Sequence, residues 1–293
     1  MNERIDHDIL QRFIFEKHQV KGALIHLRAS YQAAYSRHNY GLATQEFLGQ
    51  MLAAVGLLAS TIKFKGRLTL QLQSEGNVKL LLAQADNQLH LRGLAMGESD
   101  VITSFREAVG KGNLLISIDQ ANAKQRFQAI TAVTGETLSD TLEHYFMQSE
   151  QLPTRIWLLA NETRAAGLIL QKLPKKDDDS NFWSHIETLA QTITKSELLN
   201  LANIEILHRL FHEEDVRLFD EEPVSFRCSC SQEKMEAALR QFRQEELNDI
   251  IKKEGKVSVT CDFCNRCFEF DLVDIAKVFS GDESIFPGSD ETQ

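Results

Sequence analysis

The most informative stretches of the sequence are Cys228-Ser229-Cys230 and Cys261-Asp262-Phe263-Cys264, which lie on either side of residues 231–260. All five cysteines of the 293-residue chain come after residue 227, and the fifth, Cys267, follows the second pair. Two close pairs of cysteines are typical of a tetrahedral zinc site, in which each thiolate binds at about 2.3 Å. Because the first 227 residues contain no cysteine, the sequence excludes a disulfide framework spread over the fold and predicts one local site.

We predict that Cys228, Cys230, Cys261 and Cys264 bind one structural zinc ion per chain in the reduced form. The C-x-C pair is tighter than an ordinary zinc knuckle, and its two sulfur atoms are close enough to form a disulfide on oxidation. Cys264 and Cys267 make a second C-x-x-C, so two registers compete for the fourth ligand. We favour Cys261 and Cys264, which leaves Cys267 as a free thiol, an alternative ligand or an additional oxidisable group.

The rest of the sequence gives weak signals for catalysis. A catalytic zinc ion usually keeps an open position and a His or carboxylate ligand, and no histidine follows His212. His208 and His212 lie four residues apart on a predicted helix, where exposed or core roles are commoner than ligation. The sequence has no P-loop motif for ATP, and no thioredoxin-like βαβ unit is predicted around Cys261 and Cys264. We therefore predict that the protein is not an enzyme.

The charge balance argues against nucleic acid as a partner. The chain has 32 Lys and Arg against 42 Asp and Glu, and residues 228–293 alone have 8 against 14. Affinity for nucleic acid comes mainly from basic groups, so an acidic chain is a poor candidate. The longest apolar run, Met51–Ala59, is half of what a membrane span needs, and no signal-peptide core follows Met1–His7. We expect a cytoplasmic protein that neither binds nor crosses a membrane, with its thiols kept reduced.

The pattern of apolar residues predicts an α+β fold, with a mixed N-terminal domain over residues 1–174. Alternating apolar residues predict strands and helical spacing predicts helices. The predicted strands are Phe13–Phe15, Val20–Leu27, Arg67–Gln73, Val78–Ala83, Leu89–Leu94, Leu114–Ile118, Phe127–Val133, Ile156–Leu159 and Gly167–Gln171. The predicted helices are Ala43–Thr61 and Thr137–Gln148.

A second part, residues 175–222, is predicted to be a helical linker segment. Residues 175–180 are polar and follow Pro174, so they predict a linker, although a solvated loop within one domain has the same pattern. Apolar residues at helical spacing over Asn181–Phe211 predict helices up to Pro223. Such a short segment has little core of its own and must pack against a neighbour.

The third part, residues 223–293, is predicted to be a small zinc-binding domain. Predicted helices Gln232–Phe242 and Gln244–Glu254 precede two strands, around Val257 and around Phe268, that flank the second cysteine pair. A last helix, Leu272–Phe279, is followed by a tail that we expect to be disordered. Structural zinc contributes about 10–16 kcal/mol to the folding of small domains, so we expect this part to unfold without metal.

Several segments carry a resemblance to a known family. In the C-terminal half they are Leu210-Phe211-His212-Glu213-Glu214-Asp215-Val216-Arg217-Leu218-Phe219, Cys228-Ser229-Cys230-Ser231-Gln232-Glu233 and Cys261-Asp262-Phe263-Cys264. In the N-terminal half they are Gly135-Glu136-Thr137-Leu138 and Tyr145-Phe146-Met147-Gln148-Ser149-Glu150-Gln151. Through these segments the sequence closely resembles the redox-regulated chaperones of the 33-kDa heat-shock protein family. The resemblance covers nearly the whole chain, and Cys267 is a departure from it, because relatives usually lack a cysteine there.

The resemblance implies an ATP-independent holdase that is inactive while it is reduced and bound to zinc. It implies that oxidants form the disulfides Cys228–Cys230 and Cys261–Cys264 and expel the zinc ion. The zinc domain and the linker segment would then unfold, and the exposed apolar surface would bind unfolding client proteins under oxidative and heat stress. It also implies that the oxidised, active form is a homodimer.

The linker segment supplies apolar residues that such unfolding would expose as a binding patch. They are Leu198, Leu199, Ile204, Leu207 and Leu210. Two other functions fit the cysteine pattern without the resemblance. One is a zinc-stabilised regulatory or interaction module, and the other is a thiol–disulfide oxidoreductase that uses Cys261 and Cys264.

Overall fold

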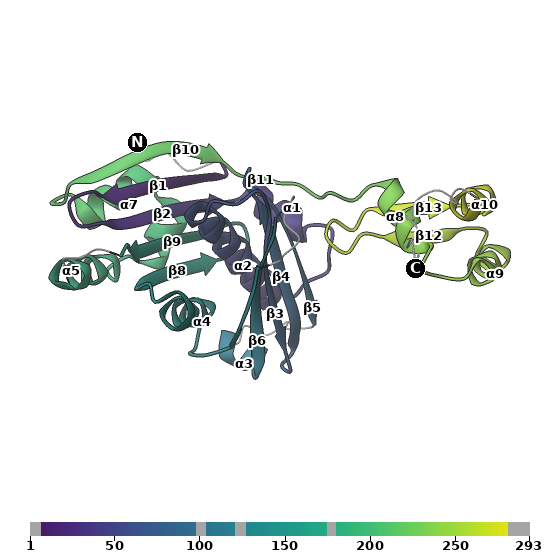
Figure 1. Ribbon diagram of the computed structural model, residues 1–293, viewed down its shortest axis with the longest axis horizontal. Coiled ribbons are helices and arrows are strands. Elements are labelled where there is room, and N and C mark those ends of the chain that lie inside the picture. Colours follow the sequence, from purple (N-terminus) through teal and green to yellow (C-terminus); the bar gives the residue numbers. More distant parts are fainter. Residues whose placement is uncertain (1–6, 98–103, 121–126, 175–179, 281–293) are drawn as a thin grey trace, which may run out of the picture. The chain divides into compact units, whose positions relative to one another are not determined.

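The computed structural model describes residues 7–97, 104–120, 127–174 and 180–280. The chain forms two compact units, residues 1–227 and 228–293, which we describe separately (Figure 1). Both contain helices and strands, so the predicted α+β class is confirmed. Residues 175–179, which make up most of the polar linker predicted at 175–180, lie outside the described residues. The predicted tail beyond residue 280 also lies outside them.

The first unit contains two β-sheets. Sheet A has the strand order β10-β1-β2-β9-β8, and every neighbouring pair in it is antiparallel. Its strands are β1 (Ile9–Phe15), β2 (Val20–Leu27), β8 (Thr154–Ala160), β9 (Ala165–Lys172) and β10 (Val216–Pro223). Sheet B has the order β11-β5-β4-β3-β6-β7, with only β11 and β5 parallel. Its strands are β3 (Gly66–Ser74), β4 (Val78–Asp86), β5 (His90–Gly97), β6 (Gly112–Gln120), β7 (Phe127–Ala132) and β11 (Ser225–Phe226).

Helix α2 (Leu42–Thr61) lies between the two sheets and contacts strands of both (Figure 1). Among the described residues it is the one helix long and apolar enough to cross a membrane, but 78% of that apolar window is buried. A helix that is apolar on all sides is typical of a protein core. Gly56 allows the close approach to β2, because a Cβ atom there would lie 2.4 Å from Ile25 Cδ1.

Three helices cover the other face of sheet A. We use the name cover for these three helices together with the edge strand β10. The helices are α5 (Ser180–Ala190), α6 (Lys195–Asn200) and α7 (Asn203–Phe211). They bury a second apolar core, distinct from the one around α2. Its strand residues are Phe13, Phe15, Val20, Leu24, Ala166, Leu168 and Leu170, and its helix residues are Phe182, Ile186, Ala190, Leu198, Leu199, Ile206, Leu207, Leu210 and Phe211, joined by Leu201 directly after α6. The linker segment therefore packs against a neighbour, as its composition required.

Shorter elements complete the first unit. They are α1 (Ala29–Tyr35), α3 (Phe105–Val109), α4 (Leu138–Tyr145) and a π-helical turn, η1 (Phe146–Glu150). The predicted helix from Thr137 is thus present, but it changes to π-helical geometry at Phe146. Thr137 begins α4 because its side chain accepts from the Asp140 N–H while the Asp140 carboxylate accepts from the Thr137 N–H.

The prediction of an all-helical linker segment is wrong at its end. Residues Val216–Pro223 form β10, an edge strand that pairs with β1. Val216 and Leu218 pack against the second core, while the acidic residues after them are tolerated at an edge that faces solvent. The cover belongs to the first compact unit, and the second unit begins at residue 228. The division of the chain into three parts at residues 174 and 222 stays a prediction.

The second unit contains α8 (Gln232–Leu239), α9 (Gln244–Glu254), β12 (Val257–Thr260), β13 (Cys267–Phe270) and α10 (Leu272–Ser280). The two strands form an antiparallel hairpin, and α10 contacts α8, α9 and β13. Gly255 ends α9 with φ of 82°, in the left-handed region that favours glycine. The predicted order of helix, helix, strand, strand and helix is confirmed.

Truncating a side chain of the second core should loosen the cover. Phe211 is 2% exposed, and its ring lies edge-on to Phe15 at 5.1 Å between centroids. We expect Phe211→Ala to lower the free energy of unfolding by about 3–5 kcal/mol, measured by urea denaturation of the reduced protein. His208→Ala removes an exposed ring from the same helix and should change it by less than about 0.5 kcal/mol. Equal effects of the two substitutions would contradict this packing.

Candidate metal centre

Cys261 and Cys264 lie in the turn that joins β12 to β13. The Cys261 N–H donates to the Arg266 carbonyl at 3.0 Å, and the Asn265 N–H donates to the Cys261 carbonyl at 2.8 Å. Asn265 has φ of 53°, a left-handed conformation that asparagine tolerates better than most residues. This turn orients both sulfur atoms to one side of the hairpin. Asn265 was not predicted from the sequence to shape this turn, although its position directly after a C-x-x-C indicates such a turn.

Cys228 and Cys230 lie in the extended segment before α8. Ser231 begins this helix, because its hydroxyl accepts from the Lys234 N–H at 3.4 Å. The Lys234 ammonium donates to the Ser229 carbonyl at 2.5 Å, which fixes the segment between the two cysteines. The positive end of α8 thus directly follows Cys230, and such a helix end favours thiolate over thiol.

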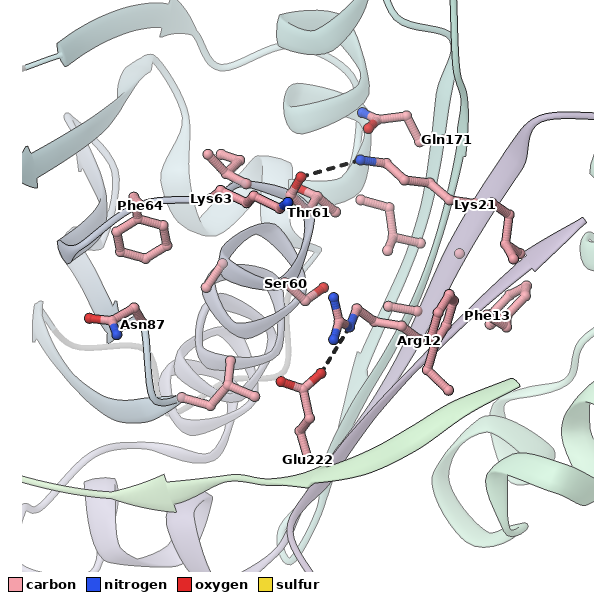
Figure 2. A pocket seen from close by; sticks show the side chains of 18 of the residues that line it. Arg12, Phe13, Lys21, Ser60, Thr61, Lys63, Phe64, Asn87, Gln171 and Glu222 are labelled. Atoms are coloured by element: carbon pink, nitrogen blue, oxygen red, sulfur yellow. Dashed lines mark hydrogen bonds and ion pairs between the residues drawn. The ribbon is translucent and has the colours of Figure 1, made fainter. Parts of the chain in front are cut away.

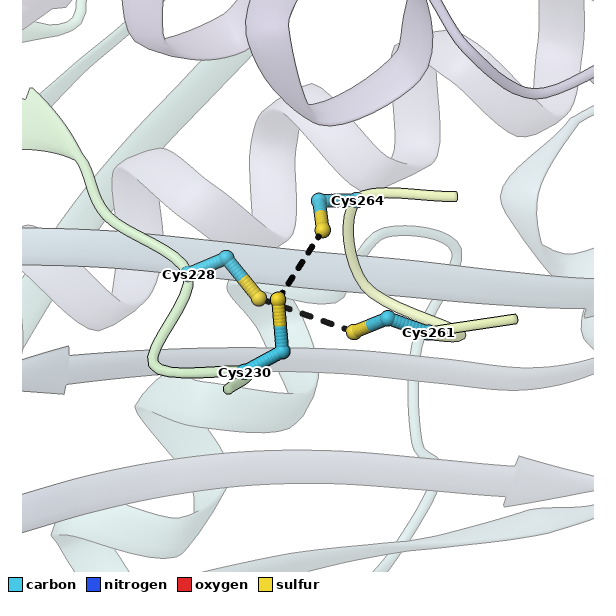
Figure 3. A group of neighbouring side chains, drawn as sticks. All are labelled: Cys228, Cys230, Cys261 and Cys264. Atoms are coloured by element: carbon cyan, nitrogen blue, oxygen red, sulfur yellow. Dashed lines mark hydrogen bonds between the residues drawn. The ribbon is translucent and has the colours of Figure 1, made fainter. Parts of the chain in front are cut away.

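The four sulfur atoms converge on one point. Every pair among Cys228, Cys230, Cys261 and Cys264 has its Sγ atoms within 4.8 Å (Figure 3). Two of the separations join the two pairs, at 3.6 Å for Cys228–Cys261 and 3.5 Å for Cys230–Cys264. A tetrahedron of sulfur atoms about 2.3 Å from a central zinc ion has edges of about 3.8 Å. The donor set and the spacing therefore fit one tetrahedral metal ion.

Burial and the contacts between the cysteines shift the pKa values of three thiols of the cluster. Burial raises the pKa of Cys228, but hydrogen bonds from the Cys230 N–H and the neighbouring thiols outweigh it and lower the pKa overall. Burial, together with the adjacent cysteines, raises the pKa of Cys230 well above its ordinary value. Burial also raises the pKa of Cys264, against an opposing hydrogen bond from the Arg266 N–H. A divalent ion placed between the four sulfur atoms would stabilise them as thiolates.

The second unit has a small apolar core around the cluster. Cys261 and Cys264 are buried, and the side chains of Cys228 and Cys230 are half-buried. The apolar residues buried in this unit are Leu239, Leu247, Val257, Phe268, Phe270, Ile275 and Val278. Units with so few buried side chains usually need a disulfide or a metal ion to fold.

Cys267 lies outside the cluster. It begins β13, its side chain is exposed, and its sulfur atom lies 4.0 Å from the Phe268 carbonyl oxygen. All five cysteines are free thiols in the structure. Of the two competing registers, the structure thus brings together the one that contains Cys261 and Cys264.

The histidines contribute no second cluster. His208 and His212 stack at 5.7 Å on the exposed side of α7. Over residues 7–97, 104–120, 127–174 and 180–280, the four cysteines are the only group of His, Cys, Asp or Glu side chains placed to hold a metal ion.

The fold and the cluster define a class of protein. It is an α+β protein of two units, and the C-terminal unit has four cysteines placed to hold a metal ion. Comparison with known proteins identifies the family. The model of the family described as "Hsp33 protein" matches residues 8–271. The chain is 46% identical over 281 residues to the 33 kDa chaperonin of Nitrosococcus oceani, covering 96% of each protein. It is 41% identical over 274 residues to the 33 kDa chaperonin of Shewanella loihica, covering 93% of this chain and 96% of that one.

A solved structure shares the fold. The crystal structure of the 33 kDa chaperonin from Thermotoga maritima superposes with a TM-score of 0.82 at 22% identity, over 94% of this chain and 98% of that chain. The chain belongs to the Hsp33 family. It is therefore a chaperone that binds client proteins and not an enzyme, as the sequence predicted. The oxidoreductase reading of Cys261 and Cys264 is excluded with the other enzymatic functions.

The assignment of the fourth ligand can be tested with single serine substitutions. We expect Cys267→Ser to retain about one zinc ion per chain, because this side chain is exposed and outside the cluster. Cys264→Ser should lose tight binding, because three thiolates leave an open position. Zinc content after gel filtration, measured with a chromogenic chelator, separates the two. Loss of the metal in Cys267→Ser with retention in Cys264→Ser would show that the register is wrong.

Proposed function

We propose that the protein is a redox-switched, ATP-independent holdase, inactive when reduced and bound to zinc. The observation that carries this proposal is the cluster of four thiols at the metal centre, in a unit too small to fold stably without a metal ion. Cys228, Cys230, Cys261 and Cys264 would hold the ion as thiolates. When bound, zinc supplies charge neutralisation and keeps the sulfur atoms deprotonated.

Oxidation would act on the thiolates in pairs. Each pair gives up two electrons to a peroxide, which takes up two protons and becomes two molecules of water while one sulfur–sulfur bond forms. The pairs expected are Cys228 with Cys230 and Cys261 with Cys264, as the resemblance to the family implies. A disulfide sulfur is a poor zinc ligand, so two such bonds would release the ion. The second unit would then lose the interaction that its small core cannot replace.

The client-binding surface would come from sheet A. In the reduced state four of the five predicted patch residues, Leu198, Leu199, Leu207 and Leu210, are buried against this sheet, whereas Ile204 is 61% exposed. Sheet A therefore supports the cover helices. Opening the cover would expose the apolar face of the sheet as well as the helices.

Covalent continuity would transmit the change. The chain runs from α7 through β10 and the two-residue strand β11 directly to Cys228. When the second unit unfolds, the ends of β10 and β11 lose their fixed continuation and fray more readily. We further propose that the oxidised protein acts as a homodimer in the cytoplasm, and that it uses neither nucleic acid nor a membrane. The acidic composition argues against nucleic acid as a partner, and the reducible thiols favour the cytoplasm.

The proposal can be tested by treating the reduced, zinc-bound protein with peroxide at a heat-shock temperature. We expect zinc release, followed by suppression of light scattering from a thermally unfolding client without ATP. Cys267→Ser, as the matched control, should behave like the unsubstituted protein. Zinc release without suppression of scattering would refute the holdase mechanism. Equal suppression by the reduced, zinc-bound protein would refute the redox switch.

A cover weakened by substitution should need less oxidation. Phe211→Ala removes a ring between α7 and sheet A, so we expect the reduced protein to suppress client aggregation partly, with its zinc still bound. His208→Ala should remain inactive until it is oxidised. Light scattering and zinc content measured on the same sample check both. A loosened cover with no gain of activity would mean that the client surface lies elsewhere.

A further inference from the structure

A cavity of about 920 Å³ lies in the first unit at the C-terminal end of α2. It exists because α2 ends at Thr61 while the inner face of sheet A continues beyond it. Six of the sheet residues that line it alternate along three adjacent strands, as residues on one face do. They are Arg12 and Ile14 of β1, Lys21 and Ala23 of β2, and Ile169 and Gln171 of β9. Phe13 and Gly22, between them in β1 and β2, also border the cavity.

The opposite wall belongs to sheet B and to the segment that leads into it. Residues 62–65 connect α2 to β3, and the β4–β5 turn adds Asn87 and Leu89. Figure 2 shows Lys21 and Arg12 extending from sheet A toward the end of α2, with Phe64 and Asn87 on the far side. The volume falls in the range of small-molecule sites, about 300–1,000 Å³.

The charges around the cavity are unbalanced. Its basic lining residues are Arg12, Lys21, Lys63 and Lys65, and its acidic ones are Asp86 and Glu222. Both carboxylates have partners. Glu222 accepts from the Arg12 Nε at 2.9 Å, and Asp86 accepts from the backbone N–H groups of Gln88 and His90. The three lysines therefore give a local positive charge in a chain whose net charge is −10.

Lys21 is the central cation of this group. It is half-buried, and its ammonium donates to the Thr61 carbonyl at 3.2 Å, at the negative end of α2. In the described part of the chain Thr61 is the one acceptor of this ammonium, so the ammonium has further N–H groups to offer a ligand. Burial lowers the pKa of Lys21, and a bound anion would reverse that effect.

The floor beside Lys21 is apolar. Ala23, Ala59 and Ile169 lie there, with Leu89 on the opposite wall. We propose that this cavity binds a small anionic amphiphile, with its carboxylate or phosphate head at Lys21, Lys63 and Lys65 and its apolar part over Ala23, Ala59 and Ile169. The binding site is separate from the cysteine cluster and independent of the redox proposal.

The test uses the reduced, zinc-bound full chain and calorimetric titration with probes below their micellar concentrations. Dodecanoate and dodecyl phosphate carry the two anionic heads, and dodecyltrimethylammonium carries a cation on the same chain. We expect saturable binding of one anionic probe molecule per chain and no comparable binding of the cation. The tighter of the two anionic probes identifies the head group. Equal affinity for the cationic probe, or no saturable binding of either anion, would overturn the proposal.

Substitutions locate the bound probe. Lys21→Met keeps the length of the side chain but removes its charge, and should weaken binding about tenfold or more. Ser60→Leu fills the cavity from α2 and should also weaken it, whereas Lys79→Met, outside the cavity, should have no effect. If circular dichroism shows that Lys21→Met or Ser60→Leu is unfolded, that variant is replaced by the double substitution of two exposed residues, Lys63→Gln and Lys65→Gln. We expect the double substitution to weaken binding of the anionic probe as well. Unchanged affinity in the folded cavity variants would place the probe elsewhere and refute the site.

Discussion

The convergence of four cysteine sulfur atoms within 4.8 Å of one another is the constraint around which the second unit is built. Thiolates at such distances cannot all be charged unless a cation lies between them. The same four residues join the segment before α8 to the β12–β13 turn, so in the proposed zinc-bound state metal binding and tertiary structure would be one event. In the proposed mechanism, an oxidant that removes the thiolates would therefore remove the main link between the two halves of this unit.

The first unit has a different source of stability, because sheet A has two apolar faces. Helix α2 covers one face together with sheet B, and the cover packs on the other. The cover comes from residues 180–223, which follow all the other strands of sheet A in the chain. A sheet whose second face is closed by a late segment can keep its own core when that segment leaves. In the proposed mechanism, this separation would let the chaperone expose apolar surface without unfolding altogether.

The sequence predicted those features that local patterns determine. The alternation of Leu68, Leu70 and Leu72 predicted β3, and the cysteine spacing singled out the residues that the fold brings together. Strand β10 was missed because its partner, β1, lies far from it in the sequence, near the start of the chain. The alternation of Val216 and Leu218 alone is too short to predict a strand. The cavity was also beyond prediction, since it depends on where α2 ends relative to sheet A. Long-range pairing and relative lengths leave no periodic signal.

Strand β10 is the element of the cover best suited to yield. It is an edge strand, and its described ion pairs with β1 and the β1–β2 turn are exposed: Arg12–Glu222, Lys17–Asp215 and Arg217–Glu16. Exposed pairs contribute little, because water and salt screen them. The helices beside it are held by buried aromatic and aliphatic side chains, which contribute far more. The side-chain contacts of the strand that continues toward Cys228 are thus the weakest in the cover, and in the proposed mechanism a loss of order in the second unit would act on this strand first.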